Sequence, residues 1–147
     1  DADGNEMFYT LNSEDSTALA YLNGKIYAVY EEQQGPGSFG PPPSKVAVLN
    51  TSLVEETGSP YNIMTDFGQI RGLTSNGTQL VATSDGGGAR VDMIDPTGFN
   101  RGQEVHFWNP SDPQFSYDTE GFDDVAFTTS TPMFFVAKGN SVWPSRF

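Results

Sequence analysis

Two short apolar runs bounded by turn-forming residues constrain the fold of this chain more than any other feature. The runs are Leu80–Thr83 and Val91–Ile94, and the glycine-rich segment Asp85–Gly88 joins them. Asn76-Gly77 precedes the first run. Asn-Gly between strand-like residues is a strong hairpin signal, because type I′ turns need positive φ at both central positions. Residues 70–98 are therefore predicted to form one antiparallel unit of about three strands.

Similar β-rich phrases recur about 50 residues apart, each with an apolar pair, a polar turn and a second apolar run. They begin at Ala18, Gly72 and Asp124, and the first also contains an Asn-Gly turn at Asn23. A strand-only unit of this length indicates propeller blades. The approximate repeats are 18–58, 70–110 and 122–147.

The central repeat carries a family resemblance. The order Gly-Leu, Asn-Gly, Leu-Val-Ala, Ser-Asp-Gly, Arg-Val and Ile-Asp-Pro within residues 70–98 resembles one blade of an NHL-repeat β-propeller. The resemblance implies an all-β fold of antiparallel, propeller-like blades, about three of them, in an incomplete ring. A two-sheet β-sandwich is the alternative, because turn signals about 8–12 residues apart suit it as well. Residues 1–147 are expected to be a single all-β domain or a fragment of a longer propeller.

Composition excludes several classes of function. The absence of cysteine rules out a disulfide framework, a thiolate metal site and a Cys nucleophile. The only histidine, His106, gives little support to a catalytic triad. A formal net charge of −12 disfavours nucleic acid and anionic membrane surfaces as partners. The longest apolar run, Met133–Ala137, is far too short to insert across a membrane.

Asp123-Asp124 is the candidate metal site. NHL-like propellers with gluconolactonase or related hydrolase activity hold a divalent cation in the central channel with carboxylate and Asn side chains. By that resemblance Asp124, with Asp123 beside it, is expected to contribute a Ca²⁺ ligand. The matching positions in the other repeats, Gly72 and Ala18, carry no carboxylate. A solvated acidic pair or a turn-forming Asp is the alternative.

Asn50-Thr51-Ser52 and Asn76-Gly77-Thr78 both match the N-glycosylation pattern. The alternative is that the turn itself requires these asparagines. The proline-rich segment 33–44 is a candidate partner-binding loop, or else a plain solvated loop. Its binding residues would be Phe39, Pro41, Pro42 and Pro43.

Aromatic residues make up 13% of the chain. They are expected to pack the core or, alternatively, to include a surface that stacks on carbohydrate. The candidates are Tyr9, Tyr21, Tyr27, Tyr30, Trp108, Phe115, Tyr117 and Trp143.

Residues in the middle of the apolar runs are predicted to be buried. They are Ile26, Ala28, Val46, Val48, Leu80, Ala82, Val91, Met93, Phe135 and Val136. The only helix expected is a single turn within Ser52–Gly58, where the spacing matches a capping box.

We therefore expect a binding or scaffolding protein, secreted or at the cell surface, rather than an enzyme. Incomplete first and last blades would leave strand edges that pair with other protein chains. Those chains would be copies of itself or the rest of a longer propeller. One alternative function is a fragment of a calcium-dependent propeller hydrolase of the lactonase type. Another is a structural subunit of an extracellular filament.

Overall fold

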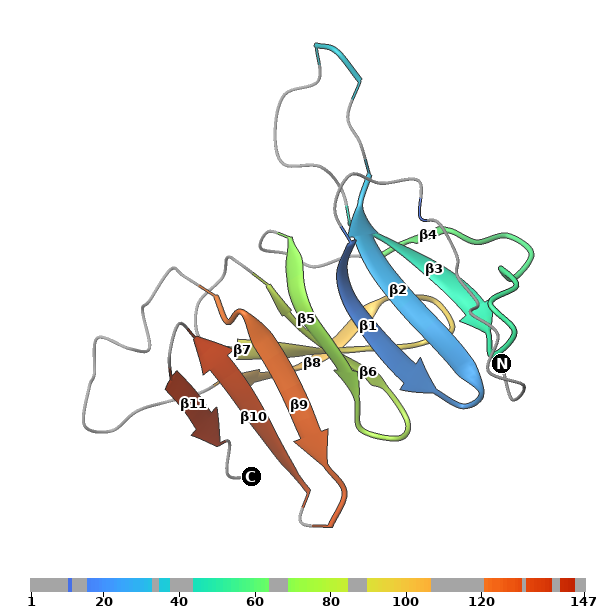
Figure 1. Cartoon of the computed structure of the whole chain (residues 1–147). Coiled ribbons are helices and arrows are strands. Elements are labelled where there is room, and N and C mark those ends of the chain that lie inside the picture. Colours follow the sequence, from blue (N-terminus) through green and yellow to red (C-terminus); the bar gives the residue numbers. More distant parts are fainter. Residues whose placement is uncertain are drawn as a thin grey trace, which may run out of the picture.

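A computed structural model describes Leu11 and residues 16–32, 35–37, 44–63, 69–84, 90–106, 121–130, 132–138 and 141–144. Over these residues the chain is all-β, with eleven strands in three antiparallel sheets and no helix (Figure 1). No described segment could therefore cross a membrane as a helix.

The first sheet is a four-stranded meander in the order β1-β2-β3-β4. Its strands are β1 (Ser16–Leu22), β2 (Lys25–Glu31), β3 (Ser44–Asn50) and β4 (Tyr61–Asn62). Asn23 and Gly24 join β1 to β2, with φ of 53° and 80°. Positive φ at both positions is what a type I′ hairpin requires, so the predicted turn is confirmed here.

The second sheet has the same meander order, β5-β6-β7-β8. Its strands are β5 (Ile70–Ser75), β6 (Leu80–Ser84), β7 (Arg90–Ile94) and β8 (Arg101–His106). Between β5 and β6 only Gly77 has positive φ (94°), so the predicted type I′ turn is wrong here. Asn76 instead accepts hydrogen bonds at Oδ1 from the backbone N–H of Thr78 and Gln79. This bonding is the Asx turn that short polar side chains favour.

The third sheet contains β9 (Asp124–Thr128), β10 (Met133–Lys138) and β11 (Ser141–Pro144), in the order β11-β10-β9. The first strand of each sheet, namely β1, β5 and β9, lies at an edge, and these three strands lie side by side (Figure 1). The three sheets form a stack that is consistent with propeller-like blades or with a sandwich, and the described residues do not close it into a ring. The predicted fold class is confirmed.

The segment between β3 and β4 was predicted to contain a helical turn, and that prediction is wrong. Asn50 Oδ1 accepts hydrogen bonds from the backbone N–H of Ser52 and Val54, at 2.9 and 3.0 Å. Glu55 then forms an isolated antiparallel bridge with Leu49. These bonds hold the backbone in tight turns and leave no room for a helical turn.

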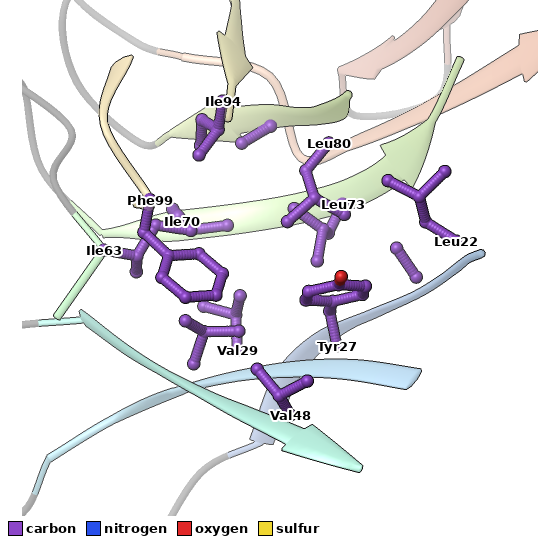
Figure 2. Close-up of a cluster of buried hydrophobic side chains, with 13 residues drawn as sticks. Leu22, Tyr27, Val29, Val48, Ile63, Ile70, Leu73, Leu80, Ile94 and Phe99 are labelled. Carbon is purple, nitrogen blue, oxygen red and sulfur yellow. The ribbon is translucent and has the colours of Figure 1, made fainter. Parts of the chain in front are cut away.

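Two apolar clusters hold the stack together, one on each side of the second sheet. The first cluster joins Tyr27, Val29 and Val48 of the first sheet to Leu73 and Leu80 of the second (Figure 2). In the second cluster, side chains of β6 and β7 meet side chains of β9 and β10. Its buried members are Val81, Val91, Met93, Phe122, Val125, Phe134 and Val136. The middle sheet is thus covered on both faces.

Most of the predicted buried residues are confirmed: Ala28, Val46, Val48, Leu80, Ala82, Val91, Met93 and Val136. Two of the ten differ. Ile26 is half-buried and the side chain of Phe135 is 37% exposed. Each lies on the face of an outer sheet that points away from the second sheet, as its strand register shows. Both residues lie in strands, as their apolar runs predicted. They are not fully buried, because no sheet of the described structure covers that face.

The middle sheet's role in the core gives a test of stability. Leu80 is fully buried, so Leu80→Ala removes its contacts with the first sheet and leaves a cavity. We expect the free energy of unfolding to fall by about 2–5 kcal/mol in urea denaturation. The control, Val54→Ala, truncates a side chain that is 60% exposed and should change stability by less than about 0.5 kcal/mol. Equal losses would contradict this packing.

Candidate functional site

The inner strands border a groove of about 460 Å³. Its polar residues are Arg71 on β5 together with Asp123 and Asp124 at the start of β9. Leu19, Leu73 and Val125 also line the groove. The groove therefore collects charged groups from two sheets at the place where β1, β5 and β9 meet.

Gly72 allows β5 and β9 to come together. A Cβ atom at this position would lie 2.6 Å from the Cα of Asp124 and 2.7 Å from Thr83 Oγ1. Real Cβ atoms do not approach backbone so closely, and the backbone of Asp124 has little freedom to move away. The sequence repeat aligned Gly72 with Asp124, and the structure brings these two positions into contact. The repeat alone did not predict that contact.

The two carboxylates of the predicted metal site are exposed and neighbour each other at the start of β9. Asp124 Oδ1 accepts a hydrogen bond from the backbone N–H of Val125 at 2.8 Å. Within the described ranges no group of three or more acidic or histidine side chains is placed to hold a metal ion. The guanidinium of Arg71 in the same groove would also repel a cation. Binding of Ca²⁺ at Asp123 and Asp124 stays a prediction.

The first sheet presents an apolar face away from the rest of the stack, here called the first outward face. On β1 it carries Leu19 and Tyr21, which are 63% and 60% exposed. They lie opposite Ala28 and Ile26 of β2. Farther along the same face, Ala28, Tyr30 and Ala47 are buried with Leu11 packed against them. The apolar surface therefore continues from a covered part to an exposed part.

The third sheet has a corresponding apolar surface, the third outward face. Its three strands place Ala126, Phe135 and Pro144 opposite one another. In the next row Ala137 lies between Val142 and the exposed Asp124. Val142 is 67% exposed, and Ala126 and Pro144 are exposed as well. The two ends of the stack thus present apolar side chains to solvent, whereas none of the exposed large hydrophobic residues of the described structure belongs to the middle sheet.

The two predicted glycosylation residues lie at turns. Asn50 is exposed at the end of β3, and Asn76 is half-buried between β5 and β6. In both, the side-chain oxygen caps the following turn, so local structure accounts for the residue type. The proposed binding loop residues, Phe39 and Pro41–Pro43, lie outside the described residues.

The candidate aromatic residues do not gather on one surface of the described structure. Tyr27 and Tyr30 are buried on opposite faces of β2, and Tyr21 is exposed on β1. Tyr9, Trp108, Phe115 and Tyr117 lie outside the described residues, as does the side chain of Trp143. His106 ends β8.

Sequence reasoning missed a buried set of charges on β7 and β8. Arg90 Nε lies 3.5 Å from Asp92 Oδ1, and Arg90 Nη1 lies 3.4 Å from Glu104 Oε1. Arg101 forms a further ion pair with Glu104. Arg90 and Asp92 are almost fully buried, and removing one partner from such a pair would leave an uncompensated charge. The sequence did contain a signal for these buried charges, because Arg90 and Asp92 alternate with Val91 and Met93 along the apolar run of β7.

Comparisons of the chain with protein-family models, with curated proteins and with solved structures find no match. The NHL likeness therefore depends on the residues of the central repeat alone.

The contact at Gly72 gives a second test. Gly72→Ala should lower the free energy of unfolding by about 1–3 kcal/mol, because the new methyl group forces β5 and β9 apart. Gly102→Ala is the control, since its Cβ would meet only ordinary contacts at 3.5 Å or more. It should be neutral within about 0.5 kcal/mol. If Gly72→Ala is as stable as Gly102→Ala, the close approach of the inner strands is wrong.

Buried tyrosines predict how stability depends on pH. Burial raises the pKa of Tyr27 and of Tyr30 above the ordinary value of 10.0. As pH rises, the unfolded chain therefore loses these protons before the folded chain does. The contribution of the two tyrosines to the free energy of unfolding is fully present below about pH 10 and declines above it. Urea denaturation at pH 8 to 11 should show this decline, and the Tyr27→Phe/Tyr30→Phe double variant should show a smaller one. An identical decline in both proteins would contradict the assignment.

Proposed function

We propose that this chain is a non-enzymatic binding or scaffolding module that assembles with other protein chains, sheet against sheet. The observation that carries the proposal is the apolar character of the first and third outward faces. A secreted or cell-surface location belongs to the same proposal, and the acidic composition supports it.

Physical chemistry favours burial of these faces. Contiguous exposed apolar patches are uncommon on monomeric proteins and commonly mark interaction sites. Each Å² of apolar surface removed from water contributes about 25 cal/mol. Leu19, Tyr21, Phe135 and Val142 all stand to gain from such burial. Polar side chains would be expected there if water were the permanent neighbour.

The occupant we propose is a second copy of the chain, with its third outward face on the first outward face of its neighbour. Within one chain, each sheet packs on the next in this same order. The two faces differ, so the contact is heterologous and generates either a closed ring or an open filament. Propellers close with about four to eight blades. Two copies of three sheets fall within that range, and the NHL-like order in residues 70–98 supports the same architecture.

Sedimentation equilibrium of the purified chain tests the proposal. The wild type should associate with increasing concentration, and more strongly at higher salt, because salt screens the repulsion between chains of net charge −12. Val142→Asp places a charge on the third outward face and should raise the dissociation constant at least about tenfold.

Val54→Asp is the matched control. It introduces the same charge at a similarly exposed valine on the turn after β3, which is not one of the residues that define either outward face, and should leave association unchanged. A wild type that stays monomeric at every concentration and salt would overturn the proposal. Equal effects of the two Asp variants would overturn it as well.

A further inference from the structure

A second hollow lies between the first and second sheets, apart from both outward faces. Its volume is about 410 Å³. Tyr27 of β2, Tyr61 of β4 and Phe99 of the turn between β7 and β8 form its aromatic wall. Lys25, Glu56 and Thr97 contribute polar groups to the same hollow. This volume is within the range of small-molecule sites, which are mostly apolar with a few polar groups.

Phe99 is held in place by an unusual backbone. Its φ is 54°, in the left-handed region that bulky residues rarely adopt. The backbone N–H of Phe99 donates to the carbonyl of Asp95 at 2.9 Å, which fixes this conformation. The ring then stacks on Tyr61, with centroids 5.1 Å apart, and meets Tyr27 edge-on at 6.2 Å. Figure 2 shows Tyr27 and Phe99 next to each other above Val48. The aromatic wall is therefore preformed.

The hydroxyl of Tyr27 is a polar group that this pocket offers to a ligand. The residue is only 4% exposed and lines the pocket. Its ring packs on Phe99, but no hydrogen bond to its hydroxyl comes from the part of the chain that the structure describes. By contrast, Tyr61 donates its hydroxyl to the carbonyl of Thr57 at 3.2 Å. The hydroxyl oxygen is not one of the buried polar atoms without a partner, so solvent reaches it in the pocket. A ligand hydroxyl can take the place of that water and bond the Tyr27 hydroxyl directly.

The charges at the pocket balance. Lys25 Nζ lies 2.7 and 2.9 Å from the two carboxylate oxygens of Glu56. The hydrogen bond to Glu56 raises the pKa of Lys25 above its ordinary value of 10.5, so the ammonium stays charged. Such a pair offers both donors and acceptors to a ligand and attracts neither a cation nor an anion. An ionic ligand therefore gains little here, and a wholly apolar ligand would leave the Tyr27 hydroxyl unsatisfied.

We propose that this pocket binds a neutral pyranose sugar. A pyranose has an apolar C–H face and hydroxyls at its edge that can both donate and accept. Its C–H face would pack on the ring of the half-buried Tyr61, because Tyr27 and Phe99 are only 4% and 3% exposed. Those hydroxyls would reach Tyr27 and the Lys25–Glu56 pair. The pocket is built from two sheets of one chain, so the proposal holds for a monomer and for an assembled chain alike.

NMR titration of the isotope-labelled chain tests the proposal with four probes: methyl glucoside, methyl galactoside, methyl mannoside and N-acetylglucosamine. At least one sugar should shift the backbone resonances of Lys25, Tyr61 and Thr97 in a saturable manner. Tyr27→Phe removes only the hydroxyl and should weaken binding by about fivefold. Tyr30→Phe removes a buried hydroxyl from the opposite face of the same strand and should leave binding unchanged.

Three outcomes would overturn the proposal. The first is that none of the four sugars shifts these resonances in the folded wild type. The second is that Tyr27→Phe and Tyr30→Phe weaken binding equally. The third is that phenol or indole, which offer an aromatic face with a single polar group, bind more tightly than every sugar.

Discussion

The backbones of β5 and β9 meet at Gly72, and the rest of the stack depends on that contact. With no Cβ at this position, Asp124 and the hydroxyl of Thr83 both lie against the glycine. The third sheet can then bring Val125 onto the middle sheet. On the other side of β5, the Ser75 hydroxyl donates to the carbonyl of Tyr21 in β1 at 3.0 Å. The inner edge strands of the three sheets, β1, β5 and β9, are thus held next to one another.

In this arrangement the two faces of each outer sheet have different surroundings. The inward faces share cores with the middle sheet, whereas the outward faces carry apolar side chains such as Leu19 and Val142 that remain in contact with water. The stack therefore has two ends with exposed apolar side chains, and our proposal is that each packs on one more sheet. The pocket at Tyr27 lies between the first and second sheets instead, so the proposed assembly and the proposed ligand binding would use separate surfaces.

Sequence predicted the strands well because their apolar runs and turns are local features, as with the Asn23-Gly24 hairpin. It failed at Asn76 because Asn-Gly suits both a type I′ turn and an Asx turn, and the side-chain hydrogen bonds decide between them. The sequence could not predict that Leu80 is fully buried while Phe135 is partly exposed, because an apolar run does not reveal which faces of a sheet are covered by another sheet. The aromatic pocket joins residues far apart in sequence, and no local pattern announces such a contact.

The most direct test of this account is the nuclear Overhauser effect between the α protons of Gly72 and Asp124. A Cβ on Gly72 would lie 2.6 Å from the Cα of Asp124, so an α proton in the same direction points at that residue. The account predicts a strong cross-peak between these two residues in the folded chain. No cross-peak between them, together with contacts from β9 to the first sheet, would contradict the propeller-like stack and favour a two-sheet sandwich.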